Sequence, residues 1–189
     1  MKICGILALQ GDFEAHANAI ARAGGHAVQV RTPSALAACD GLIIPGGEST
    51  TMLKLLDFEG LTEPIQAFAA RKPIYGSCAG AILLARDVSH PAQASLGLLD
   101  IAVERNAYGR QIESRISRIT VVDPYGNDSE MEAVFIRAPI IRNIGPGVTT
   151  LAWYQGDPVW IEEGPHMATT FHPELTADLR VHQRFLSRL

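Results

Sequence analysis

Three apolar segments in the first half of the chain each run into a glycine-containing turn, and this pattern limits the fold most strongly. The segments are Ile3 to Leu9, Gly41 to Ile44 and Pro73 to Tyr75, and a helical pattern follows each turn. Nearly continuous apolar strands are typical of a parallel sheet covered on both faces. Strands that alternate with helices favour the same arrangement. We therefore expect an α/β fold with a mostly parallel central sheet and helices on both faces.

The remaining elements of this half follow from periodicity and from start and stop signals. A helix is expected from Phe13 to Ala23, with Asp12 as a candidate N-cap and Gly24-Gly25 as its end. A short strand is expected at Ala27 to Val30. The other expected helices are Thr50 to Leu56, Glu63 to Ala70 and an apolar one that ends at Ala85.

The second half consists mainly of short strand-like runs separated by turn signals. The expected strands are Ile101 to Glu104, Ile116 to Val122, Ala133 to Ile136, Val148 to Trp153, Val159 to Glu162 and Ala168 to Phe171. We expect added, partly antiparallel strands and one closing helix at Ala177 to Leu189. No linker, repeat or low-complexity segment interrupts the chain, so residues 1–189 are expected to form a single domain.

Composition excludes several classes of protein. The 189 residues carry a net charge of −4, with 19% charged and 47% hydrophobic residues, so a disordered chain or a general nucleic-acid binder is not expected. Three cysteines give no disulfide framework, and no Cys or His spacing indicates zinc. No apolar stretch is long enough to span a membrane. We expect a reduced, cytoplasmic, soluble protein without a metal.

Gly76-Ser77-Cys78-Ala79-Gly80 is the strongest indication of chemistry, because it lies between an apolar strand and an apolar helix. A G-x-nucleophile-x-G turn at such a junction is typical of a nucleophile elbow. The helix N-terminus favours a thiolate at Cys78, and the N–H of Ala79 is placed to bind an oxyanion. The alternative is an inert, buried Cys78 on a tight turn. Cys4 and Cys39 lack this setting and are expected in the core or in loops.

Phe171-His172-Pro173-Glu174 is the second indication, since a cysteine nucleophile needs a base and the base needs an orienting acceptor. Residues two apart in an extended segment point the same way, so His172 could face the thiol while Glu174 holds its other ring nitrogen. The alternative is a strand end with a helix cap. We expect His182 on the surface of the last helix.

Pro45-Gly46-Gly47-Glu48-Ser49-Thr50-Thr51 follows the third strand, where ligands bind in doubly wound sheets. Exposed N–H groups there could form a phosphate nest or part of an oxyanion hole. The Glu48 carboxylate disfavours phosphate and suits an ammonium group. The alternative is a plain turn in which Ser49 or Thr50 caps the helix.

Taken in chain order, these segments resemble the class I (triad) glutamine amidotransferases, and most of all the glutaminase subunits of pyridoxal 5′-phosphate synthase. Ser77 stands where that family usually has Thr. The resemblance implies a flavodoxin-like class I amidotransferase architecture. It rests on the three segments above together with Leu7-Ala8-Leu9-Gln10-Gly11, Glu104-Arg105-Asn106-Ala107-Tyr108-Gly109-Arg110-Gln111, Phe135-Ile136-Arg137-Ala138-Pro139 and Leu175.

The resemblance implies hydrolysis of L-glutamine to L-glutamate and ammonia through a Cys78 thioester. His172 would be the acid and base, Glu174 would orient it, and the amides of Gly47 and Ala79 would form the oxyanion hole. Glu48 suits the α-ammonium of the substrate, and an arginine suits its α-carboxylate. The implied substrate-binding residues are Gly47, Glu48, Ser49, Arg105, Ile136, Arg137 and, near the oxyanion hole, Gln10.

No cofactor is implied, and the ammonia would pass to a separate synthase subunit, a (β/α)8 barrel in a large complex. Three alternatives stay open. The first is the glutaminase subunit of imidazole glycerol phosphate synthase, and the second is an elbow-cysteine protein of the chaperone or peptidase-like type. The third is a non-catalytic binding module. Arg105 and Arg137 could instead form surface salt bridges.

Overall fold

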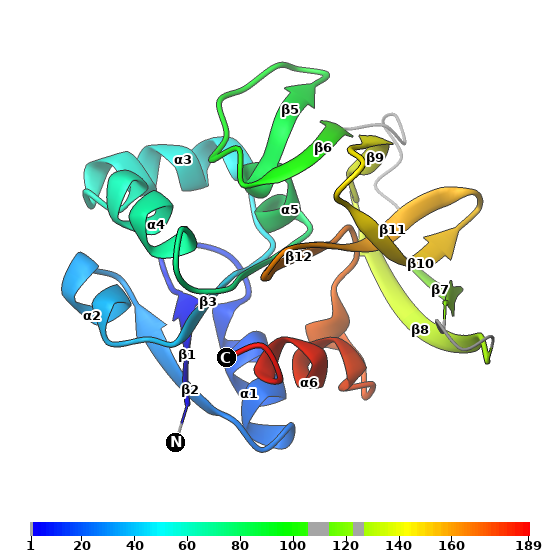
Figure 1. Cartoon of the computed structure of the whole chain (residues 1–189), viewed down its shortest axis with the longest axis horizontal. Coiled ribbons are helices and arrows are strands. Elements are labelled where there is room, and N and C mark those ends of the chain that lie inside the picture. The colour runs from blue at the N-terminus through cyan, green and yellow to red at the C-terminus, as the bar shows by residue number, and fades with distance from the viewer. Residues whose placement is uncertain (1, 106–113, 123–126) are drawn as a thin grey trace.

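The computed structural model describes residues 2–105, 114–122 and 127–189, which form a nine-stranded sheet, a three-stranded sheet and six α-helices (Figure 1). The helices are α1 (Phe13–Arg22), α2 (Pro33–Ala37), α3 (Ser49–Phe58), α4 (Thr62–Ala69), α5 (Ala79–Leu84) and α6 (Arg180–Leu186), with a 3-10 turn, η1, at Pro173–Leu175. The strands of the large sheet are β1 (Ile3–Leu7), β2 (His26–Val30), β3 (Gly41–Ile44), β4 (Ile74–Ser77), β7 (Ser114–Val121), β8 (Ser129–Ile136), β10 (Thr149–Tyr154), β11 (Asp157–Glu163) and β12 (His166–Thr169). The small sheet contains β5 (Ala85–Ser89), β6 (Leu99–Glu104) and β9 (Ile140–Ile144).

The large sheet has two halves that meet at β12. Its strand order is β2-β1-β3-β4-β12-β11-β10-β7-β8, and the pairs up to β12 are parallel. The pairs beyond β12 are antiparallel. The expected α/β fold is confirmed, but in the described residues the antiparallel half contributes as many strand pairs as the parallel half.

Each face of the parallel half is covered by helices, as the continuous apolar strands require. Leu42 and Ile44 of β3 pack with residues of α2, α3, α4 and α5 on one face. Ile43, between them, points to the opposite face and packs with Ile20 of α1 and Phe185 of α6. This alternation along one strand divides the core into two clusters. Figure 1 shows α1 and α6 together on one side of the sheet and α3, α4 and α5 on the other.

Most predicted elements are confirmed, with differences at their ends. The closing helix is shorter than predicted, because η1 occupies the residues after His172 and α6 begins only at Arg180. Four described elements were not predicted: α2, β5, β9 and η1. The motif residues from Asn106 to Gln111 lie outside the described residues.

The parallel strands bring the predicted motifs to one edge of the sheet. Gln10 follows β1, Gly46 follows β3, Cys78 follows β4 and His172 follows β12. Carboxyl ends of parallel strands form the usual ligand-binding edge of an open α/β sheet.

Candidate active site

Cys78 occupies a strained turn between β4 and α5. Its backbone has φ 49° and ψ −104°, a conformation that is rare for a residue other than glycine. The turn is tight, since a Cβ placed on Gly76 would lie 2.5 Å from the carbonyl carbon of Gly80. The N–H of Cys78 donates to the carbonyl of Thr169 on β12 at 2.8 Å. These features are those of a nucleophile elbow, which presents its side chain at the sheet edge.

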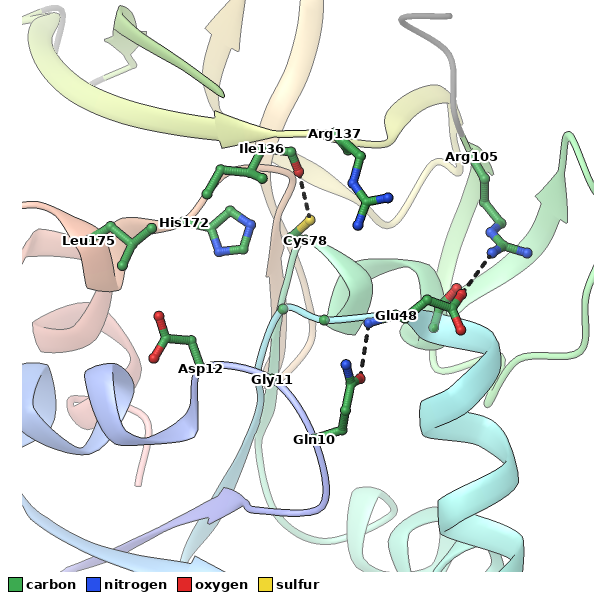
Figure 2. Close-up of a pocket in the computed structure, with 13 residues that line it drawn as sticks. Gln10, Gly11, Asp12, Glu48, Cys78, Arg105, Ile136, Arg137, His172 and Leu175 are labelled. Atoms are coloured by element: carbon green, nitrogen blue, oxygen red, sulfur yellow. Dashed lines mark hydrogen bonds and ion pairs between the residues drawn. The ribbon is translucent and has the colours of Figure 1, made fainter. Parts of the chain in front are cut away.

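The thiol of Cys78 faces a cavity of about 360 Å³ at this edge (Figure 2). This volume is within the range of small-molecule sites. The lining residues come from loops after β1, β3, β4, β8 and β12 and from the end of β6. They are Gln10, Gly11, Asp12, Gly46, Gly47, Glu48, Ser49, Cys78, Arg105, Ile136, Arg137, His172 and Leu175.

His172 lies beside Cys78 and is held by Glu174. The Nδ1 of His172 is 2.7 Å from Oε1 of Glu174, and both side chains are buried. The segment is not extended, contrary to the basis of the prediction, because Pro173 begins the 3-10 turn η1. Within this turn the carboxylate still reaches back to the ring. The contact predicted between these two residues is therefore present, produced by a turn instead of a strand.

Electrostatics favour an ionised pair at this position. Burial alone would lower the pKa of His172, but contacts with the Cys78 thiol and the Glu174 carboxylate outweigh it and raise the pKa to about 10. Burial would raise the pKa of Glu174, yet the nearby His16 and His172 rings hold it below its usual value. A protonated His172 ring bonded to an ionised Glu174 is therefore the favoured state of this pair.

Glu48 lines the pocket, as expected, and also has a structural role that the sequence interpretation did not assign to it. It is the N-cap of α3 and accepts hydrogen bonds from the backbone of Thr50 and Thr51, at 3.1 and 2.8 Å. Hydrogen bonds of this kind outweigh the effect of burial and lower its pKa to about 2. Glu48, and not Ser49 or Thr50, therefore caps the helix.

Arg105 pairs with this same carboxylate. Its Nη2 lies 3.4 Å from Oε1 of Glu48 and 3.2 Å from the hydroxyl of Thr50 (Figure 2). Arg105 thus forms an ion pair, as the alternative interpretation held. It does so as one of the residues that line the pocket. Glu48 and Arg105 form one charged unit at the pocket wall.

Gln10 supports the glycine loop from below. Its Oε1 accepts from the N–H of Glu48 at 3.0 Å (Figure 2), and a Cβ on Gly47 would lie 2.6 Å from the same oxygen. On the other side, a Cβ on Gly46 would lie 2.4 Å from Cε1 of His172. The loop is therefore packed between Gln10 and the ring of His172, with no space for side chains.

Arg137 and Ile136 cover the pocket from the end of β8. The carbonyl of Ile136 accepts a long contact of 3.7 Å from the thiol of Cys78. Arg137 has a positive φ of 44°, and Figure 2 shows its side chain directed into the pocket. Ser49 is nearly buried and its hydroxyl donates to Gln93 at 3.0 Å.

The structure brings almost all predicted site residues to one cavity. Ala79 and Glu174 do not line it: Ala79 begins α5 behind the elbow, and Glu174 lies behind the ring of His172. The pocket also includes Gly11, Asp12 and Leu175, which the sequence interpretation did not assign to the site. Their position next to assigned motif residues was the only available signal.

The prediction for His182 was wrong. It is fully buried, and its Nε2 lies 3.1 Å from Nδ1 of His16, which is also fully buried. His182 lies on the buried side of α6, because α6 packs against α1 at this point (Figure 1). Cys4 and Cys39 are buried in the core, as expected.

The described residues contain neither a candidate metal site nor a candidate membrane-spanning helix. In residues 2–105, 114–122 and 127–189, no group of three or more His, Cys, Asp or Glu side chains is arranged to hold a metal ion. Within the same ranges no helix has the length and apolarity needed to cross a membrane.

Comparison with solved structures defines the class of the fold. The chain superimposes on a crystal structure of a glutamine amidotransferase with a TM-score of 0.89 and 42% identity, over 98% of this chain and 97% of that one. A structure of PurLQS from Thermotoga maritima gives a TM-score of 0.76 at 17% identity, over 98% and 97% of the two chains, and this likeness concerns the fold alone.

Residues 6–189 match the SNO glutamine amidotransferase family, and the chain belongs to this family. A relative from Solibacter usitatus is 57% identical over 192 residues, covering 100% of both sequences. Another, from Koribacter versatilis, is 54% identical over 98% of this chain and 94% of the relative. Both relatives are named pyridoxal 5′-phosphate synthase subunit PdxT.

Proposed function

We propose that this chain is the glutaminase subunit of a pyridoxal 5′-phosphate synthase. It hydrolyses L-glutamine to L-glutamate and ammonia and passes the ammonia to a synthase subunit. The observation that carries this proposal is the position of Cys78, on a strained elbow in the same pocket as His172, whose ring Glu174 holds at 2.7 Å. Full-length relatives with the corresponding name support it.

The reaction assigns a role to each member of this triad. The Cys78 sulfur attacks the side-chain amide carbon, and the protonated His172 ring donates its proton to the departing ammonia. Water, activated by the same ring, then cleaves the glutamyl thioester. Glu174 keeps the Nδ1 proton of His172 directed at itself, so that Nε2 faces the sulfur. The amides of Gly47 and Ala79 stabilise the tetrahedral oxyanion.

The pocket wall offers charges that suit the ends of an amino acid. The Arg137 guanidinium is directed into the pocket and can bind the α-carboxylate in a bidentate manner. Glu48 is ionised and about half exposed, so its negative charge at the pocket wall can attract the α-ammonium. Arg105 orients Glu48 from behind, while Gly47, Ser49, Ile136 and Gln10 complete the lining.

The acceptor of the ammonia is a separate synthase subunit, which we propose to be a (β/α)8 barrel in a large hetero-oligomeric complex in the cytoplasm. Residues 1–189 then act as one glutaminase domain. The packing of the Gly46-Gly47 loop between Gln10 and His172 supports a coupling between subunits, because a partner that shifts Gln10 would change the loop and the oxyanion hole together.

The test is glutamate release from L-glutamine with and without the synthase subunit. We expect weak activity alone, a large increase with the partner and none for Cys78→Ala in either condition. Full activity of the isolated chain would overturn the coupling, and glutamate release by Cys78→Ala would overturn the nucleophile. Activation by an imidazole glycerol phosphate synthase partner instead would reassign the complex.

A further inference from the structure

We propose that His16 is a positioning residue for the Cys78–His172–Glu174 triad, and that His182 fixes the tautomer in which His16 acts. The inference deepens the proposed function and rests on it for the role of the triad. It starts from the second carboxylate oxygen of Glu174, which His172 does not engage.

This oxygen is buried and depends on one neighbour. Oε2 of Glu174 has no hydrogen bond of good geometry within the described residues, and the Glu174 side chain has no solvent exposure. Nε2 of His16 lies 3.3 Å from it. The same nitrogen is 2.9 Å from the hydroxyl of Ser77, the residue before the nucleophile. His16 therefore contacts both Glu174 of the triad and the elbow that carries Cys78.

Donor and acceptor requirements assign the protons. A carboxylate accepts only, so a lone pair on Nε2 of His16 would face another lone pair at 3.3 Å, and the hydrogen must reside on this nitrogen. Burial outweighs the pull of Glu174 and lowers the pKa of His16, which keeps its ring neutral. In a neutral ring with Nε2–H, Nδ1 is the acceptor.

His182 supplies the matching donor. Its Nε2 is 3.1 Å from Nδ1 of His16 and must carry a hydrogen to satisfy it. Burial lowers the pKa of His182 to about 3, so this ring is neutral as well. Its remaining Nδ1 is then a bare lone pair, which is consistent with the lack of any partner for that atom among the described residues. The opposite tautomers would leave a buried N–H unpaired there, which costs more.

The result is a buried chain of contacts that runs from α6 through α1 to the catalytic thiol. His182 donates to His16, His16 donates to Ser77 and lies 3.3 Å from Oε2 of Glu174, and Glu174 accepts from His172. The charged or titratable groups around the His16–His182 pair are His172 and Glu174 after β12, Asp12 before α1, Tyr75 on β4 and Arg22 on α1. Of these, only Glu174 offers a negative charge at contact distance.

Three substitutions at His16 separate positioning from packing. His16→Gln retains a donor near the position of Nε2, whereas His16→Asn, one methylene shorter, has an amide only near the position of Nδ1. His16→Phe keeps the ring and removes both nitrogens. His182→Phe leaves His16 free to adopt the other tautomer. Circular dichroism and thermal unfolding identify any variant that does not fold, and the Gln and Asn pair remains if His16→Phe fails.

Two readouts apply. The first is kcat and KM for glutamine in complex with the synthase subunit. The second is the rate of iodoacetamide alkylation of Cys78 from pH 5 to 9, which needs neither glutamine nor a partner. Cys4 and Cys39 are fully buried and do not compete, and Cys78→Ala gives the background.

We expect His16→Phe and His16→Asn to lower kcat by about tenfold or more, with KM unchanged within about twofold. Alkylation near pH 6 should slow in the same variants, while His16→Gln stays near wild type. His182→Phe should give an intermediate loss. Equal kcat and alkylation profiles for Gln, Asn and wild type would overturn the inference. A wild type that shows the alkylation profile but releases no glutamate would overturn the proposed function alone.

Discussion

Gly46 and His172 are in such close contact that the glycine has no space for even one additional carbon. A Cβ at Gly46 would lie 2.4 Å from Cε1 of the imidazole ring. Because the φ of Gly46 is not positive, alanine fits the backbone and conflicts with the ring. The position of the base is therefore limited by the loop after β3 as well as by Glu174.

Gly46→Ala should displace His172 and lower kcat by about 100-fold, since a shift of about 1 Å in a reacting group can cost that much. The free energy of unfolding should change little by comparison. Gly147→Ala is the control, because its Cβ would approach only the carboxylate of Glu163, at 3.3 Å, and Gly147 does not line the pocket. Steady-state glutaminase assays of both variants in the synthase complex provide the measurement. Equal kcat in the two variants would contradict the steric argument.

Glu174→Gln should lower kcat by about two to four orders of magnitude. The neutral amide lacks the negative charge with which the carboxylate keeps the His172 ring protonated and in position. The pKa of His172, raised to about 10 partly by this carboxylate, should fall. Histidine NMR titration measures that change directly. Glu162→Gln is a matched control, since it also removes a buried carboxylate, one bonded to Arg184 at 2.6 Å outside the pocket. A Glu174→Gln variant with the activity of this control would show that Glu174 has no role in catalysis.

Folding stability should depend on pH through His172. Its pKa rises from 6.5 in the unfolded chain to about 10 in the folded one, so its contribution is complete below pH 6.5 and is lost as the pH rises through 10. Urea unfolding across pH 6.5 to 10 should show a steeper loss for wild type than for His172→Gln. Parallel curves for the two proteins would show that the ring is not protonated in the folded state.

Glu48→Ala and Arg105→Ala should separate capping from substrate binding. Both remove the 3.4 Å ion pair, so both should raise KM for glutamine. Only Glu48→Ala removes the N-cap of α3, which is worth about 1 kcal/mol. Chemical denaturation should therefore distinguish them while kinetics do not. An unchanged KM in both variants would place this ion pair outside substrate recognition.

Arg137→Gly and Arg137→Ala should raise KM equally, by about tenfold or more, because both lose the guanidinium that suits the α-carboxylate. Their stabilities should differ. Glycine relieves the φ of 44° whereas alanine retains the strain, so Arg137→Gly should be the more stable of the two by about 1 kcal/mol. Thermal unfolding measures the difference. A more stable alanine variant would show that the backbone at this position is not strained.

The parallel half of the fold and its motif edge could be predicted because β1, β3 and β4 coincide with apolar runs that end at glycine-containing turns. Gly41–Ile44 was placed to the residue for this reason. The strand β9 was missed, because Ile140–Ile144 carries only short apolar character and pairs with a strand far away in sequence. Such long-range pairing leaves no local signal.

Most residues of the pocket could be predicted from motifs, and so could the contact between His172 and Glu174, but the other contacts could not. The capping of α3 by Glu48 was not predicted, because it depends on backbone N–H groups that no side-chain pattern reports. His182 was expected at the surface, because a single histidine in a short helix gives no indication of a buried partner 166 residues away. Both cases concern polar side chains whose partners are defined only by tertiary packing.

The two strands that carry the nucleophile and the base are hydrogen-bonded neighbours in the middle of the large sheet. β4 pairs with β12 directly, and the N–H of Cys78 extends this ladder to the carbonyl of Thr169. The distance between the sulfur and the imidazole is thus set by two paired strands that the two core clusters bury. The reacting atoms are therefore aligned when the sheet forms. Substrate and partner then have only the loops to organise, and the pair itself should be among the last parts of the molecule to open.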